Sequence, residues 1–223
     1  MKKQPVIAVD GYSSTGKSSI SKEIAQRLGI IHMDTGALYR AITYDALQHC
    51  AEGNSIDFKC LFSRLDQIKL EFKTQDHALI LLMNGEDVST PIRSMQVSQN
   101  VSDVAKQPEV REYLLHTQRA MAEQGGVIMD GRDIGSVVLP NADFKFFLTA
   151  SVEERTKRRY LELKASGVET TMEEVRANLI ERDLKDSQRA VAPLIQAPDA
   201  ILIDNSNMDK EQTIEKILSY IQG

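Results

Sequence analysis

A glycine-bounded segment near the start of the chain carries the clearest chemical pattern in the sequence. Residues 11–18 read Gly-Tyr-Ser-Ser-Thr-Gly-Lys-Ser, which fits the pattern GxxxxGK[ST] in full. The glycines let the backbone curl so that N–H groups point at phosphate oxygens, and the following helix start adds partial positive charge. Lys17 can reach the β- and γ-phosphates, and the Ser18 hydroxyl can ligate Mg²⁺. The pattern predicts a nucleoside triphosphate site and does not specify the acceptor.

A basic run between residues 155 and 159 is a second candidate for contact with the triphosphate. The simpler interpretation of such a run is a solvated helix face. The alternative is a lid that closes on the nucleotide, because Arg155 and Arg159 lie one turn apart on one face. One would stack on the base and the other would meet phosphate. The residues predicted to bind the triphosphate are Gly11, Tyr12, Ser13, Ser14, Thr15, Gly16, Lys17, Ser18, Ser19, Arg155 and Arg159.

Two further segments place charged and hydroxyl groups after apolar strands. In residues 34–40, Thr35 and Arg40 lie about one turn apart near a helix start, where an acceptor phosphate can sit. In residues 130–133, Asp130 can hold a Mg²⁺-bound water, and Arg132 can bridge phosphates bidentately. Both segments follow predicted parallel strands, whose carboxyl ends bind ligands in open α/β sheets.

Asp10 and Asp34 flank these segments, and two roles remain open for each. Each carboxylate can cap a helix or accept a buried hydrogen bond, and each can equally take part in the chemistry.

The elements that must position these groups alternate between strand and helix. Short apolar runs predict buried strands over residues 6–9, 30–33, 127–130, 144–148 and 200–204. Helices are expected over residues 17–28 and 38–49. Capping boxes at Ser151 with Glu154 and at Thr171 with Glu174 predict two more helices, and Asp209 with Gln212 starts another. This alternation predicts an α/β fold with a doubly wound parallel sheet.

One stretch has a different character. Residues 69–73 alternate, as does part of 77–83, and Asn84-Gly85 has the composition of a hairpin turn. We expect a single domain with its core at about 1–55 and 95–223. An inserted antiparallel-β subdomain is expected at about 56–94, and a helical lid at about 151–190.

Bulk properties exclude several other classes of protein. The 223 residues carry a net charge of −5, which argues against a duplex nucleic-acid binder. Cys50 and Cys60 fit neither a CxxC pair nor a zinc half-site, so two reduced thiols are expected. No HExxH occurs, and no apolar run is long enough to span a membrane or to form a secretory signal. We expect a cytoplasmic monomer.

Over nearly its whole length the chain resembles the nucleoside monophosphate kinase family, and within it the bacterial cytidylate kinases. The resemblance is carried by residues 7–11, 33–40, 101–105 with Pro108, Val110 and Arg111, 130–140, and the motif spread over 181–194. Adenylate and thymidylate kinases share the first two segments but not the run Gly-Arg-Asp-Ile-Gly-Ser-Val-Val at 131–138. The inserted segment at 56–94 then corresponds to an enlarged monophosphate-binding region in a P-loop kinase core.

The resemblance implies direct, in-line transfer from ATP to CMP or dCMP with Mg²⁺. The residues that it implies for the acceptor are Thr35, Arg40, Ser102, Arg111, Arg132, Asp133, Arg182, Asp186 and Arg189. Ser102, Arg111 and Asp133 would face the cytosine and ribose. Arg182 and Asp186 would reach ribose or phosphate from the lid. Four cations would act on the moving charge, namely Lys17, Arg132, Arg182 and Arg189. Ser18 and, through water, Asp130 would hold the metal.

Within this resemblance, Asp133 offers a reason for base selection. Its carboxylate suits the amino group of cytosine, whereas uracil and thymine present an acceptor there. An unpaired buried polar group costs about 1–3 kcal/mol. Two alternatives remain: a kinase for UMP, AMP or a non-nucleotide acceptor, and a regulatory nucleotide switch without acceptor chemistry. The chain has no NKxD sequence, which argues against a GTPase.

Overall fold

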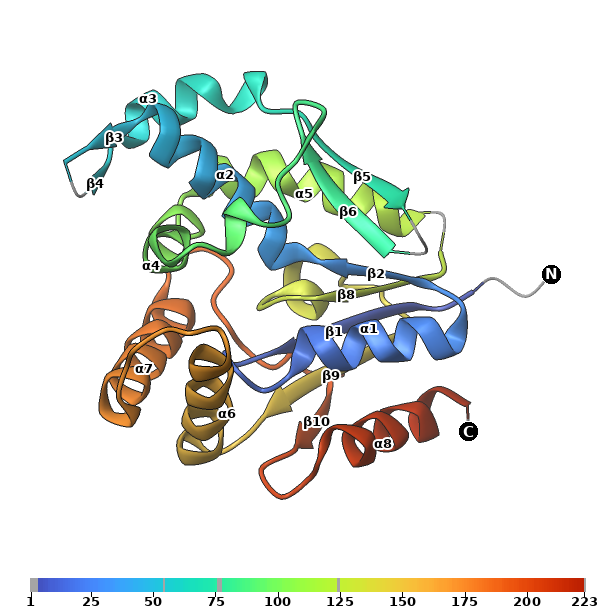
Figure 1. Ribbon diagram of the computed structural model, residues 1–223. Helices are drawn as coiled ribbons and strands as arrows, with labels where there is room; N and C mark the ends of the chain where they lie inside the picture. The colour runs from blue at the N-terminus through green and yellow to red at the C-terminus, as the bar shows by residue number, and fades with distance from the viewer. Residues whose placement is uncertain (1–3, 54, 76–77, 124, 223) are drawn as a thin grey trace. The chain divides into compact units, whose positions relative to one another are not determined.

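The computed structural model describes residues 4–53, 55–75, 78–123 and 125–222 (Figure 1). The chain forms two compact units. The first comprises residues 1–32 and 124–223, and the second is Met33–Glu123. The proposed insertion at 56–94 falls inside the second unit, which extends beyond it on both sides. Each unit is described by itself.

A five-stranded sheet with the order β10-β9-β1-β8-β2 runs through the first unit. Its strands are β1 (Val6–Gly11), β2 (Ile31–Asp34), β8 (Val127–Asp130), β9 (Phe144–Thr149) and β10 (Ile201–Asp204), and the last two residues of β2 are counted with the second unit. β1 pairs in parallel with β8 and β9, and β9 pairs in parallel with β10. Every residue of β1 is buried, as expected for a central strand. The segment 11–18 therefore leaves from the middle of the sheet.

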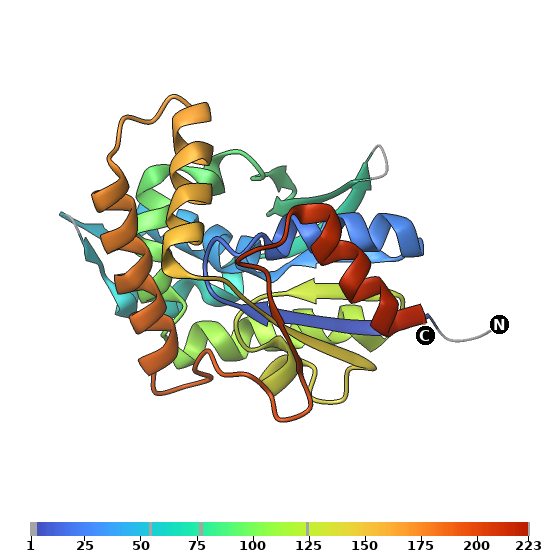
Figure 2. The ribbon, with the colours of Figure 1, turned by 90° about the horizontal axis from the view of Figure 1, so that it is seen from below.

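The helices of the first unit are α1 (Lys17–Leu28), α6 (Val152–Ala165), α7 (Met172–Gln188) and α8 (Lys210–Gln222). α1 and α8 pack on one face of the sheet, where Ile24 and Ile217 join a buried cluster with Val9 and Phe146. α6 and α7 lie side by side in both views (Figures 1 and 2). This arrangement confirms the predicted α/β fold with a parallel sheet.

Local signals set most of these boundaries. α1 spans the residues predicted for it, since Gly16 and Gly29 take left-handed conformations at its two ends. The capping box at Thr171 and Glu174 is present in both directions. At Ser151 the prediction of a full box is wrong: its hydroxyl accepts from Glu154 N–H, but its own N–H donates to Ser206 Oγ at 2.8 Å. A neighbouring loop replaces the glutamate there.

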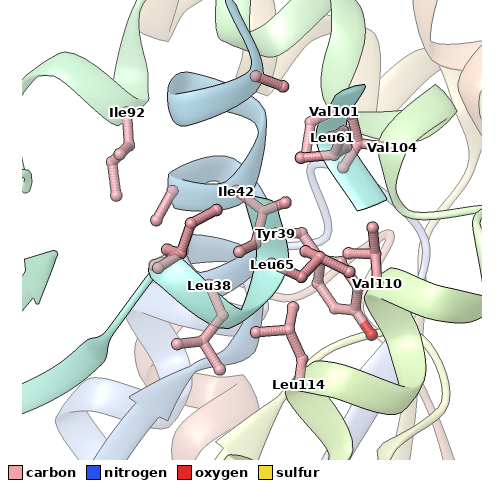
Figure 3. Close-up of a cluster of buried hydrophobic side chains, with 14 of the residues drawn as sticks. Leu38, Tyr39, Ile42, Leu61, Leu65, Ile92, Val101, Val104, Val110 and Leu114 are labelled. Carbon is pink, nitrogen blue, oxygen red and sulfur yellow. The ribbon is translucent and has the colours of Figure 1, made fainter. Parts of the chain in front are cut away.

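The second unit is built around α2 (Thr35–His49). Among the described residues of this unit there are three further α-helices, α3 (Phe58–Arg64), α4 (Met95–Val104) and α5 (Pro108–Glu123). Two small antiparallel sheets complete it, one of β3 (Ala51–Glu52) and β4 (Ser55–Ile56), the other of β5 (Leu70–Gln75), β6 (Ala78–Met83) and β7 (Glu86–Asp87). Figure 3 shows its buried cluster, in which Leu38 and Ile42 of α2 lie among Leu61, Val104 and Leu114. This core fixes α2.

Two expectations for this unit are tested directly. The hairpin is confirmed: β5 pairs with β6 in antiparallel register, and Asn84 and Gly85 have positive φ angles in the turn to β7. His77, part of the alternating pattern, lies outside the described residues. α2 begins at Thr35, three residues before the predicted start, because the Asp34 side chain accepts from Ala37 N–H and caps it.

The expectation of two reduced thiols is wrong. Cys50 and Cys60 form a disulfide with their Cα atoms 5.6 Å apart. Cys50 ends α2, and the β3–β4 hairpin returns the chain so that Asp57 N–H donates to Cys50 O at 2.8 Å. Cys60 follows on α3. The pairing depends on this local fold, which the spacing of the two cysteines does not reveal. Among the described residues, no helix combines the length and the apolar character needed to cross a bilayer.

Candidate active site

The backbone of the segment 11–16 bends sharply, and at Gly11 it leaves no room for a side chain. Gly11 has a φ angle of 144°, and a Cβ atom there would lie 2.0 Å from Leu148 O on β9. Ser14 and Gly16 have φ angles of 60° and 86°. Such left-handed turns before a helix direct successive N–H groups inward and form an anion-binding concavity. We call residues 11–18 the phosphate loop.

Lys17 lies inside this loop. Its Nζ donates to Tyr12 O at 2.6 Å, and the side chain is buried. Burial and the nearby charge of Arg132 hold the pKa of Lys17 well below its ordinary value, against the opposing influence of Asp130 and Asp10. An anion bound in the loop would favour the charged form of this amine.

Arg132 reaches the phosphate loop from the end of β8. Its guanidinium donates to Ser13 Oγ at 2.8 Å and to Asp186 Oδ2 of α7 at 2.8 Å. Burial would raise the pKa of Asp186, but Arg132, Arg182 and Arg189 hold it below its ordinary value. Arg132 therefore joins the loop to α7 through partly buried, charged hydrogen bonds.

A second buried ion pair lies next to the first. Arg189, which ends α7, donates to Asp133 Oδ1 at 3.0 Å and also to Ala192 O. Both side chains are at least 95 % buried. Arg182 is one helical turn before Asp186, and its charge acts on both Asp186 and Lys17. The structure thus gathers Arg132, Asp133, Arg182, Asp186 and Arg189 around the phosphate loop.

The carboxylates of Asp10 in β1 and Asp130 at the end of β8 have different hydrogen-bond partners. Asp10 accepts backbone N–H groups from Ile134 and Gly135, both at 2.7 Å, and so fixes a π-helical turn at Ile134–Val138. Burial raises its pKa to about 6. Asp130 lies 2.6 Å from Nε2 of His32, a partner that the sequence did not reveal. Asp10 thus has a buried hydrogen-bonding role, just as Asp34 has a capping role.

The donors near the loop suit Mg²⁺ better than a metal held by protein alone. Among the residues that the structure describes, no group of three or more His, Cys, Asp or Glu side chains can hold an ion. Mg²⁺ usually takes one or two protein oxygens and fills its octahedron with phosphates and water. The Ser18 hydroxyl in the first turn of α1 and, through water, the Asp130 carboxylate would provide such a set.

A cavity of about 360 Å³ opens beside the phosphate loop. The residues that line it come from the loop, α1, α6, the segment before α8 and the first residue of α8: Ser14, Thr15, Gly16, Ser19, Ile20, Glu154, Arg158, Arg159, Glu162, Asn205, Met208, Asp209 and Lys210. The cavity has room for a nucleoside. Sequence reasoning identified the loop residues and Arg159 but missed Asn205, since no motif marks it.

Arg155 has a different place from Arg159. It is 3 % exposed and does not line the cavity. It donates to Ser13 O at 3.2 Å and to Asp183 Oδ2 at 2.6 Å, and its guanidinium lies 5.2 Å from the centre of the Tyr12 ring. Arg155 therefore supports the phosphate loop through backbone and ring contacts. Its predicted contact with the nucleotide stays a prediction.

The remaining predicted residues belong to the second unit, on helices that pack together. Thr35 is the first residue of α2 and is buried. Arg40 donates to Ser98 Oγ at 2.9 Å and to Ile92 O at 3.3 Å. Arg111 of α5 lies over the Tyr39 ring, 5.4 Å from its centre. Ser102 is on α4, so α2, α4 and α5 together carry these four side chains.

The chain is similar in sequence to known proteins over nearly its full length. The sequence model of the family described as Cytidylate kinase matches residues 7–223. This chain is 47 %, 48 % and 44 % identical to proteins named cytidylate kinase from Geobacillus kaustophilus, Desulfitobacterium hafniense and Ligilactobacillus salivarius, respectively. These alignments cover 99 %, 98 % and 100 % of this chain and 98 %, 93 % and 98 % of the relatives.

A solved structure supports the fold independently. A crystal structure of an uncharacterized protein from Eubacterium ventriosum has a TM-score of 0.52 at 14 % identity and covers 99 % of both chains. At that identity the likeness concerns the fold alone. The near-complete family match and the identities above 40 % carry the assignment: this chain belongs to the cytidylate kinase family.

Proposed function

We propose that this protein transfers the γ-phosphoryl group of ATP to CMP or dCMP, with ADP and CDP or dCDP as products. One observation supports this most strongly. Arg132, from the segment 130–133, donates to Ser13 of the phosphate loop, and the neighbouring Asp133 pairs with Arg189. The motif expected to hold the acceptor thus lies against the motif expected to hold the donor. The family membership of the chain agrees with this activity.

The donor side uses groups that are fixed before any nucleotide arrives. The N–H groups of residues 11–19 and the start of α1 would receive the triphosphate, with Lys17 at the β- and γ-phosphates. The cavity beside Gly16 and Ser19 has room for the nucleoside, and Arg159 on its wall would contact it. Arg155 would support the phosphate loop through its contacts with Ser13 and Tyr12.

The acceptor side is rich in guanidinium groups that already hold carboxylates. A CMP phosphate would compete with Asp186 for Arg132 and would also meet Arg182 and Arg189. Thr35, Arg40, Ser102 and Arg111 are proposed to contact the same nucleotide, as the family resemblance implies. Asp133 would accept the amino group of cytosine, and that contact would select against uracil and thymine.

The proposed chemistry is a single in-line displacement. An oxygen of the acceptor phosphate forms a bond to the γ-phosphorus as the bond to the β,γ-bridging oxygen breaks. The nucleophile is itself an anion, so no strong general base is needed. Lys17, Arg132, Arg182 and Arg189 would neutralise the charge that moves, since positioning and electrostatics dominate such reactions. Mg²⁺ held by Ser18 and, through water, Asp130 would add positive charge at the phosphates.

The same proposal extends to the state of the protein in the cell. We propose a monomer, because the lid and the inserted subdomain must move freely, and the cytoplasm as its compartment.

A panel of acceptors tests the proposal. Purified protein is given ATP·Mg²⁺ and, in turn, CMP, dCMP, UMP and AMP, and ADP release is followed by a coupled assay. We expect release with CMP or dCMP to exceed release with UMP or AMP by about 5- to 150-fold, from the cost of about 1–3 kcal/mol for an unpaired polar group. Equal rates with AMP and CMP would contradict the role of Asp133. ATP binding without any acceptor-dependent ADP release would instead indicate a nucleotide switch.

A further inference from the structure

Asn205 follows β10 directly and is almost fully buried, with 2 % of its surface exposed. Its backbone N–H donates to Thr149 O at 2.9 Å, which extends the parallel pairing of β10 with β9. The segment that it begins leads into α8 (Figure 2). The side chain is therefore fixed at the carboxyl edge of the sheet, from which the phosphate loop also leaves.

The amide of Asn205 makes two hydrogen bonds of opposite direction. Nδ2 donates to Thr15 O of the phosphate loop at 2.9 Å, and Oδ1 accepts from the Arg158 guanidinium at 3.1 Å. A backbone carbonyl can only accept and a guanidinium can only donate, so the joining side chain must offer both functions. This requirement also fixes which way the amide points. Neither a carboxylate nor an aliphatic chain of the same size can meet it.

Arg158 is held more firmly than its neighbour Arg159. Its Nε donates to Glu154 at 3.1 Å, and a terminal nitrogen donates to Asn205 O at 2.8 Å. Arg159 is paired with Glu162, whose side chain is 64 % exposed, and exposed pairs contribute little. Of these two arginines on the cavity wall, Arg158 is thus the one whose orientation is set in advance.

Thr15, Arg158 and Asn205 all line the cavity beside the phosphate loop. One wall of this cavity is the loop and another is α6, and the Asn205 amide joins them. We propose that Asn205 is a positioning residue for the donor nucleotide, acting through the Thr15 peptide and the Arg158 guanidinium. The inference rests on the proposed function, because it takes ATP as the occupant of this cavity. A preoriented wall binds more tightly because less ordering is lost on binding.

The test compares ATP and CMP in the same variant. In Asn205→Leu, both amide hydrogen bonds are lost, so we expect the Kd for ATP·Mg²⁺, measured by calorimetry without CMP, to rise about tenfold. The KM for ATP should rise in parallel, while the KM for CMP stays within about twofold. Asn207→Leu is the matched control, since Asn207 is exposed on the same segment and does not line the cavity. That control should bind ATP like the wild type.

Two further variants keep the test decisive. Asn205→Asp preserves size and the acceptor for Arg158 but loses the donor to Thr15. It should also weaken ATP binding, and it decides the question if Asn205→Leu does not fold. In a cycle with Arg158→Gln, the combined loss should be smaller than the product of the single losses, because one contact is shared.

Three outcomes would overturn the inference: unchanged ATP binding in the Asn205 variants, equal increases in the KM for ATP and CMP, or fully multiplicative losses in the cycle. Failure of the proposed function is separate from these, because it would appear in the wild type as an absence of CMP-dependent ADP release.

Discussion

At the residue scale, the cluster around the phosphate loop depends on buried charges that neutralise one another. Arg132 and Asp186 form one pair, and Asp133 and Arg189 form the other. Truncating one partner of such a pair leaves an uncompensated charge and costs about 3–5 kcal/mol. With Arg132→Ala, a loss of activity could not be separated from a loss of stability. A variant that keeps the positive charge, Arg132→Lys, is therefore the better probe.

We predict that Arg132→Lys folds but turns over slowly. The ammonium group keeps a positive charge beside Asp186, so the free energy of unfolding should change by about 1 kcal/mol or less. A lysine cannot bridge Ser13 and a phosphate with a rigid fork, so kcat for CMP should fall about 100-fold. Steady-state kinetics and urea unfolding of the same preparation check both parts. A kcat equal to that of the wild type would contradict the assigned role of Arg132.

Asp10 makes stability depend on pH. Its pKa is raised to about 6 in the folded protein, chiefly by burial, from 3.8 when unfolded. The folded state therefore binds this proton more tightly. The resulting stabilisation is fully present below about pH 4 and is lost as the pH rises through about 6.

We predict that the wild type loses about 2.5 kcal/mol relative to Asp10→Asn between pH 4 and pH 7. Urea unfolding of both proteins across this range measures the difference. Above about pH 7 the difference should be constant, because Asp10 is then ionised in both states. A difference that did not vary between pH 4 and pH 7 would mean that burial does not shift this carboxyl.

Site residues that belong to a recognisable motif were predictable from the sequence. Site residues whose role depends on contacts with distant residues were not. The phosphate loop and the segment 130–133 can be recognised from the types of their residues and the spacing between them. Asn205 and His32 are ordinary polar residues until Thr15, Arg158 and Asp130 are brought beside them. Their partners are far away along the chain, and a single sequence does not encode such contacts as a pattern.

At the scale of elements, the sequence predicts a helix or strand boundary correctly where neighbouring residues determine that boundary. α1 and β8 occupy the predicted residues, since glycines or a short apolar run define them. The π-helical turn at Ile134–Val138 was not predicted, because Asp10 fixes it from another strand. α4 and α5 were also missed, since their helical form is stabilised by packing on α2.

The disulfide is an element-scale feature of the second unit. It closes a short loop, with a sequence separation of 10, between the end of α2 and α3. Such a constraint on the unfolded chain is worth about 3 kcal/mol. We predict that Cys50→Ser/Cys60→Ser unfolds at correspondingly lower urea than the wild type in a buffer without reductant.

Two measurements control this prediction. With a strong reductant present, the wild type and the double variant should unfold at the same urea concentration. Thiol titration of the wild type, denatured without reductant, should find no free thiol, whereas two free thiols per chain would show that the bond does not form.

At the scale of the whole molecule, composition and family agree on a small-molecule enzyme. The net charge is −5, yet Arg132 donates to the phosphate loop and Arg189 pairs with the neighbouring Asp133. The family match extends from residue 7 to the last residue. These facts favour two bound nucleotides over a nucleic-acid or regulatory partner. We propose that the γ-phosphoryl group passes directly between them.

Labelled phosphate tests that claim most directly. ATP with a radioactive γ-phosphate is incubated with the protein, Mg²⁺ and CMP, and the products and the denatured protein are separated. Direct transfer predicts that the label moves into the β-phosphate of CDP in step with ADP formation and that none is covalently attached to the protein. Label retained on the denatured protein, or released mainly as inorganic phosphate, would contradict the account.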